Sequence, residues 1–183
     1  MRVTYRYIRP VTVLYARGNG CYEAAARLAW EKLGGWLVAH NARRHIRRGF
    51  GIFRDNPQVT ATDLLRYDAC VEMTPGLDMA GNAGIARQVL GGGTHAIHTH
   101  VGSYGGLGNL MSELHRDFVP RQGLTVDYDR PFMAIHLNDP LLMREVHRRT
   151  ELCVPVMPLP LAIGDNSACE DPADPMLRLA GSA

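Results

Sequence analysis

Apolar positions in the first half of the chain change period along its length, and each period predicts an element. Val11 to Ala16 is a branched and aromatic run typical of a strand, and it ends at the turn Gly18-Asn19-Gly20. Apolar residues at 26, 30, 33 and 37 follow with the spacing of one helical face. They predict a helix over Tyr22 to Val38. Later apolar runs predict two strands, Phe50 to Phe53 and Tyr67 to Met73.

The second half repeats this order. Thr94 to His100 is expected to be a strand, and the turn Gly102-Ser103 follows it. Apolar residues at 107, 110, 111, 114 and 118 predict a helix that stops before Pro120. The last apolar runs predict two strands, Phe132 to Leu137 and Thr150 to Val156. The segment between the halves is expected to contain a short helix near Ala83 to Leu90.

The two halves also share residue types at a nearly constant offset. A shift of 82 places Tyr22 on Tyr104, and a shift of 83 places Asp68 on Glu151 and Cys70 on Cys153. This pattern predicts an α+β fold of two tandem strand-helix-strand-strand modules related by a pseudo-twofold axis, with antiparallel sheets and a helix packed in each half. A seam between two such modules is a natural place for a ligand.

Composition and length fit one compact unit. The chain has 183 residues, 46% of them apolar, and a net charge of +2, which is too small to indicate a nucleic-acid partner. We expect a domain over 1–156, with module one at about 3–74, a linker at 75–93 and module two at 94–156. A flexible, proline-rich tail is expected over 157–183. No signal peptide or membrane-spanning run is apparent, so a cytoplasmic location without membrane contact is expected.

Several separated motifs resemble the GyrI-like small-molecule-binding domain over about residues 3–156. They are Thr94 to Tyr104, Asn138-Asp139-Pro140, Arg149 to Val156, Gly51 to Pro57 and Leu65 to Cys70. The resemblance implies two modules about a pseudo-twofold axis. Such domains are the effector-binding parts of AraC-type and MerR-type regulators, gyrase-inhibitor-like proteins, or hydrolases of cyclopropane-containing compounds. Because the domain begins near Met1 and the tail is short, we expect a stand-alone form that does not contact DNA directly.

Two acidic residues are candidates for the ligand site. Along the last predicted strand, Leu152 and Val154 share one face, whereas Glu151 and Cys153 share the other, and the repeat gives Asp68 a matching position. The resemblance implies that a carboxylate among aromatic residues recognises lipophilic cations, and Glu151 fits this role best. A desolvated carboxylate gains by pairing with such a cation. The alternative is a strand-end carboxylate that pairs with Arg149 or Arg66.

Aromatic residues complete the candidate site. Tyr22 and Tyr104 each follow a glycine turn, Trp30 lies on the apolar stripe of the first helix, and Tyr67 lies on a strand; each either lines the pocket or belongs to the core. His98 and His100 have a spacing that suits a metal, with His136 as a third ligand. No carboxylate pattern or second such pair supports a metal site, so we expect neither metal nor cofactor.

The sequence thus predicts a protein that binds hydrophobic, aromatic or cationic small molecules in a cleft between the modules, for sequestration or sensing. The alternative is a hydrolase in which Glu151 activates water and Tyr104 donates a hydrogen bond. No nucleophile elbow or phosphate loop favours an enzyme. A third hypothesis is a gyrase-inhibitor-like protein. The surface that would contact gyrase or a regulator is not identifiable from the sequence.

Overall fold

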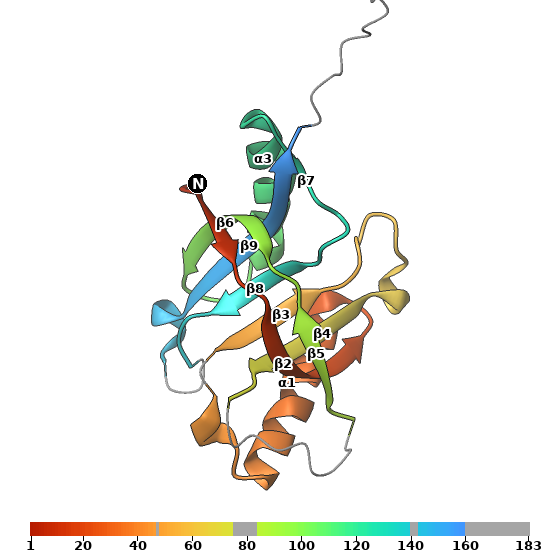
Figure 1. Ribbon diagram of the computed structural model, residues 1–183. Helices are drawn as coiled ribbons and strands as arrows, with labels where there is room; N and C mark the ends of the chain where they lie inside the picture. The colour runs from red at the N-terminus through yellow and green to blue at the C-terminus, as the bar shows by residue number, and fades with distance from the viewer. Residues whose placement is uncertain (47, 75–83, 140–142, 160–183) are drawn as a thin grey trace, which may run out of the picture.

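A computed structural model describes residues 1–46, 48–74, 84–139 and 143–159 (Figure 1). Its centre is one antiparallel sheet whose strands follow the order β1-β6-β9-β8-β3-β4-β2-β5, with β7 paired to β9 outside this path. The strands are β1 (Thr4–Ile8), β2 (Val11–Asn19), β3 (Gly49–Phe53), β4 (Arg66–Glu72), β5 (Ala86–Leu90), β6 (Gly93–Val101), β7 (Leu124–Val126), β8 (Phe132–His136) and β9 (Arg149–Pro158).

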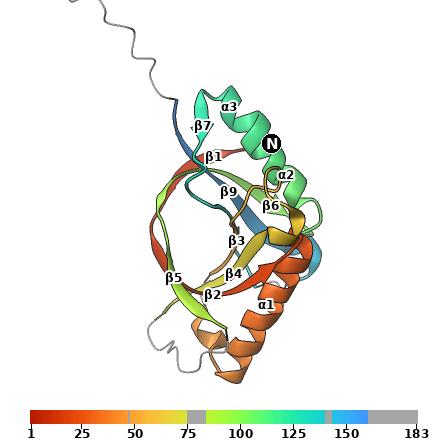
Figure 2. The same cartoon turned by 90° about the vertical axis from the view of Figure 1, so that its right-hand side faces the viewer.

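The sheet curls into a half-barrel, and the helices lie outside it (Figure 2). Helix α1 (Tyr22–Ala39) packs on β2 and β4. Helix α2 (Leu107–Glu113) runs into a π-helical turn at Leu114–Phe118 and then into α3 (Val119–Arg121). Short 3₁₀ turns occupy Arg43–His45, Thr62–Leu64 and Glu145–His147. The predicted α+β class is therefore confirmed as a sheet-dominated, curled fold with two main helices.

Both faces of the central strands carry buried clusters, and alternate residues of each strand contribute to opposite faces. The outer face packs in two clusters, one under α1 that includes Ala69 and Val71, and one under α2 that includes Leu152 and Val154. The inner, concave face holds a third cluster: Val13, Phe50, Ile52, Cys70, Leu90, Ile97, Met133, Ile135 and Cys153. The predicted alternation along β9 is confirmed, because Leu152 and Cys153 belong to different clusters.

Two local predictions are wrong. The segment expected to form a short helix near Ala83 to Leu90 contains the strand β5, which pairs with the edge of β2 from Val11 opposite Leu90. Tertiary pairing overrides the local pattern here. The second helix also continues past Pro120, because the Val119 N–H donates to the Leu114 carbonyl five residues back, and this wider turn accommodates a residue without an N–H.

The ends of the predicted domain are described in part. Strand β9 runs to Pro158, and residues 160–183 of the predicted tail lie outside the described residues, as do 75–83 of the predicted linker. Strand β1, which the apolar pattern did not predict, adds an edge to the sheet beside β6. Of the helices in the described ranges, none is long and apolar enough to span a bilayer.

Candidate functional site

Six rings from both halves of the chain meet on the outer face of the sheet, and we call this group the aromatic seam: Tyr22, Trp30, Phe53, Tyr67, Tyr104 and His136. The centroid of Phe53 lies 5.1 Å from that of Tyr22 and 5.4 Å from that of Tyr67. The centroid of His136 lies 5.3 Å from that of Trp30 and 5.4 Å from that of Tyr104. The structure thus brings together all four aromatic residues predicted for the site.

A glycine in β3 makes this seam possible. A Cβ on Gly51 would lie 1.9 Å from the Tyr67 hydroxyl oxygen, so only glycine leaves room for that ring against the sheet. Trp30 Nε1 donates a hydrogen bond of 3.2 Å to the same hydroxyl oxygen. Burial raises the pKa of Tyr67 well above its ordinary value. The Tyr67 phenol is therefore a neutral, packed group at the centre of the seam.

Asp68 lies on the opposite, inner face of the sheet and is fully buried. Arg17 binds both its carboxylate oxygens at 2.6 and 2.9 Å, and Arg54 Nε donates to it at 2.7 Å. The Gln88 amide also donates to it at 3.3 Å. Burial raises the pKa of the Asp68 carboxyl, but the hydrogen bonds from Arg17 and Arg54 outweigh this effect and leave the pKa below its ordinary value. Asp68 is thus a fully paired carboxylate.

Glu151 has a different environment on the same inner face. Its side chain is 14% exposed, and its carboxylate lies 2.6 Å from Arg6 Nη2, whose side chain is 53% exposed. The sequence offered Arg149 or Arg66 as an alternative partner, but Glu151 forms its ion pair with Arg6 of β1. Arg66 binds Asp55 instead, at 2.7 Å. The partner was missed because β1 was not among the predicted strands.

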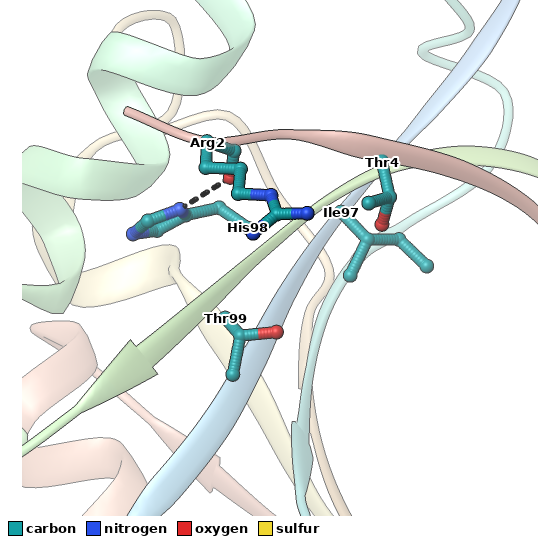
Figure 3. Close-up of a pocket in the computed structure, with 5 residues that line it drawn as sticks. All are labelled: Arg2, Thr4, Ile97, His98 and Thr99. Carbon is teal, nitrogen blue, oxygen red and sulfur yellow. Dashed lines mark hydrogen bonds between the residues drawn. The ribbon is translucent and has the colours of Figure 1, made fainter.

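A hollow of about 290 Å³ opens at the edge strand of the sheet. It is lined by Arg2, Thr4, Ile97, His98 and Thr99, at the edge where β1 pairs with β6 (Figure 3). Thr99 is the direct cross-strand partner of Glu151 in the β6–β9 pair, so the hollow and the carboxylate are neighbours. Its volume lies just below the range of about 300–1,000 Å³ that is usual for small-molecule pockets.

The six predicted residues therefore do not form one pocket. Glu151 shares its face with Cys153 and the inner cluster, whereas His136, the contact of Tyr104, shares its face with Ala134 and the outer cluster. Asp68 shares the inner face with Cys70, whereas its neighbour Tyr67 shares the outer face with Ala69. The strand period of two separates carboxylates from aromatic rings by the thickness of the sheet.

The two histidines with the spacing of metal ligands, His98 and His100, each donate a hydrogen bond to the backbone. His98 Nδ1 donates to the Arg2 carbonyl at 2.9 Å, as Figure 3 shows, and His100 Nε2 donates to the Ser103 carbonyl at 2.8 Å. Within the described part of the chain, no three His, Cys, Asp or Glu side chains lie close enough together to hold a metal ion.

The chain matches the family model of the GyrI-like small molecule binding domain over residues 1–157, and it belongs to this family. No curated protein matches the chain.

Solved structures share the fold at low identity. The EcmrR C-terminal domain is similar at a TM-score of 0.68 and 14% identity, over 86% of this chain and 98% of that one. EcmrR in its DNA complex is similar at a TM-score of 0.67 and 15% identity, and the match covers 86% of this chain but 58% of EcmrR. SAV2435 bound to tetraphenylphosphonium is similar at a TM-score of 0.58 and 14% identity, over 86% of this chain and 94% of SAV2435. A hydrolase from Listeria innocua is similar at a TM-score of 0.55 and 14% identity, over 85% of this chain and 92% of the hydrolase.

Proposed function

We propose that the protein binds lipophilic cations for sequestration or sensing, and that Glu151 neutralises the bound charge in the hollow between β1 and β6. The observation that carries this proposal is the contrast between Glu151 and Asp68. Both carboxylates lie near the start of an equivalent strand, yet two arginines whose side chains are 36% and 22% exposed surround Asp68, whereas the described contacts of Glu151 include one arginine that is 53% exposed. The likeness to a protein bound to tetraphenylphosphonium supports the same ligand class.

The comparison of the two carboxylates rests on a pseudo-twofold relation between the halves. The strand order reads the same in reverse when β1 exchanges with β5, β2 with β6, β3 with β8 and β4 with β9. Gly51 pairs with Ala134, its own counterpart at an offset of 83, and this pairing supports an axis between them. The hydrogen bond from Gly20 N–H to the Leu65 carbonyl also has a counterpart from Gly102 to Arg148, both 2.9 Å long.

The offset identifies what the second half lacks. Arg17 corresponds to Thr99 at an offset of 82, and Arg54 corresponds to Leu137 at an offset of 83. Neither residue carries a charge, so the two guanidinium groups that neutralise Asp68 have no counterpart around Glu151. Thr99 also lines the hollow. The ligand would therefore occupy the space that an arginine at position 99, the counterpart of Arg17, would fill.

A ligand cation would enter by exchange with Arg6. Because the Arg6 side chain is half-exposed, it loses little when it returns to water. Glu151 stays paired throughout, which avoids the cost of a partly buried, unpaired carboxylate. An apolar body on the ligand would cover Ile97 and the methyl groups of Thr4 and Thr99. The site therefore selects molecules that combine positive charge with apolar surface.

The positions of Glu151 and Tyr104 do not support the hydrolase hypothesis. It required Glu151 and Tyr104 to act on one substrate, and these side chains lie on opposite faces of the sheet. A role in transcription through a separate regulator, as the likeness to EcmrR suggests, is compatible with cation binding.

Calorimetric titration with tetraphenylphosphonium tests the proposal. We expect Glu151→Gln to weaken binding by about 10- to 100-fold, the effect of losing one charged partner. Glu145→Gln, an exposed carboxylate change in the same half, is the matched control and should bind like wild type. Equal dissociation constants for wild type and Glu151→Gln would remove Glu151 from the site. Mass spectrometry of the same mixtures should return intact ligand, and a gain of one water would indicate hydrolysis.

A further inference from the structure

Two hydroxyl groups line the hollow at the edge of the sheet, one from Thr4 and one from Thr99. Thr4 is the direct cross-strand partner of Ile97, and Thr99 lies two residues further along β6, so both side chains share the face that carries Ile97. Figure 3 shows both hydroxyl oxygens toward the Ile97 side chain, and no residue drawn there forms a hydrogen bond with either. Both threonines are exposed, so a ligand in the hollow can reach these oxygens.

The pairing of the strands places the two hydroxyls around Glu151. Thr99 is directly opposite Glu151 in the β6–β9 pair, where Cβ atoms lie about 4.5–5.5 Å apart. Thr4 is the diagonal neighbour of Thr99 across the β1–β6 pair, at about 7–8 Å. A charged nitrogen lies about 2.8 Å from each oxygen that it contacts, so one nitrogen between these side chains can reach both hydroxyls and the carboxylate.

The chain itself shows which kind of cation these carboxylates accept. Arg17, the counterpart of Thr99, donates two hydrogen bonds to the Asp68 carboxylate, at 2.6 and 2.9 Å. Arg6 reaches Glu151 through an N–H group as well, at 2.6 Å. The cations that occupy both sites are therefore hydrogen-bond donors, and charge-assisted hydrogen bonds are stronger than neutral ones. A ligand that replaces Arg6 keeps this contact only if it also carries N–H groups.

The Thr4 hydroxyl has no counterpart in the first half. At the offset of 82, Thr4 corresponds to Ala86. Ala86 pairs with Tyr15 as Thr4 pairs with Ile97, and these two partners are themselves related by the same offset. The strand pairing therefore does not need a hydroxyl at this position. The second half combines a carboxylate with two hydroxyls, whereas the first half combines a carboxylate with a guanidinium and a methyl group.

We propose that the cationic group of the ligand is a primary ammonium, which donates its N–H groups to the Glu151 carboxylate and to the hydroxyls of Thr4 and Thr99. This assignment rests on the proposed cation site and names the group that the site recognises. A primary ammonium carries three donors, one for each acceptor. A quaternary ammonium carries none, so it would displace water from both hydroxyls without replacing its hydrogen bonds. The volume of about 290 Å³ suits an amine with one small apolar group.

Benzylamine and benzyltrimethylammonium are the matched probes, because both are cations at pH 7 and they differ only in the methyl groups that replace the N–H groups. In calorimetric titrations of the wild-type protein, we expect benzylamine to bind at least about 10-fold more tightly, because it alone can form these hydrogen bonds. The substitutions Thr4→Val and Thr99→Val keep the branched shape that suits a strand, so both variants should fold. Each should reduce the preference by about 3- to 10-fold.

Thr94→Val is the matched control, since Thr94 is an exposed threonine of the same strand that does not line the hollow. It should keep the full preference for benzylamine. Equal dissociation constants for the two probes in the wild-type protein would overturn the proposal. An unchanged preference in both Thr4→Val and Thr99→Val would also overturn it, because the ammonium would then bind elsewhere.

Failure of the cation site itself has a different signature. In that case Glu151→Gln would leave the affinity for both probes unchanged, and both the site and the ammonium assignment would fall. If Glu151→Gln weakens both probes but the wild-type protein binds them equally, the cation site stands and only the assignment of a primary ammonium is wrong.

Discussion

Asp68→Asn is expected to destabilise the protein by about 3 kcal/mol, the low end of the range for breaking a buried ion pair. The substitution keeps the volume of the side chain but leaves Arg17 and Arg54 without their shared carboxylate. The effect is at the low end because both arginine side chains keep some contact with water, at 36% and 22% exposure. Urea unfolding at pH 7 measures it.

Asp63→Asn is the matched control for this measurement. Asp63 is exposed in the turn before β4, and its substitution should change the free energy of unfolding by less than about 0.5 kcal/mol. A loss of similar size in both variants would show that the Asp68 cluster does not stabilise the fold.

The stabilisation by Asp68 should also depend on pH in a defined direction. Because the folded-state pKa of Asp68 lies below its ordinary value, the contribution is complete above the unfolded pKa of about 4 and is lost as the pH falls through the folded pKa. The difference in free energy of unfolding between wild type and Asp68→Asn should therefore be constant near neutral pH and shrink below about pH 4. A constant difference down to pH 2 would contradict this.

Gly51→Ala is expected to destabilise the protein by about 1–3 kcal/mol, the usual cost of overpacking. The new methyl group would lie 1.9 Å from the Tyr67 hydroxyl oxygen, so the ring must move and its hydrogen bond from Trp30 must stretch or break. Gly35→Ala is the control, since no atom lies within 4 Å of its added Cβ and it sits within α1. It should stabilise the helix by up to about 1 kcal/mol. Equal thermal shifts for the two variants would contradict the packing of the seam.

Most of the strands were predictable because their apolar side chains are buried in the core of the domain. β2, β3, β4, β6, β8 and β9 each fill at least one buried cluster, so their patterns are strong. β1 is almost wholly exposed: its two tyrosines face solvent, and of its five residues only Ile8 packs against a buried cluster. β5 alternates only weakly, and its pairing with β2 depends on a long-range contact that local patterns do not encode.

The candidate site was only partly predictable, for the same physical reason. The strand period correctly separated Glu151 from Leu152, but it does not say which face a helix will cover. Because α1 and α2 cover the face opposite Glu151, the aromatic residues gathered on the other side of the sheet from the predicted carboxylates. Arg6 was missed with its strand. His136 was weighed as a metal ligand, and its isolation inside a ring cluster is visible only in three dimensions.

The most direct test of the account is a titration of tetraphenylphosphonium into Arg6→Gln and Thr99→Arg. Arg6→Gln removes the chain's own cation from Glu151 and should tighten binding by several-fold. Thr99→Arg restores the counterpart of Arg17 beside Glu151 and should weaken binding by at least about 10-fold, because the ligand would have to displace a second guanidinium. These opposite shifts are the predicted result. Unchanged affinity in both variants would show that the vacancy around Glu151 is not where the cation binds.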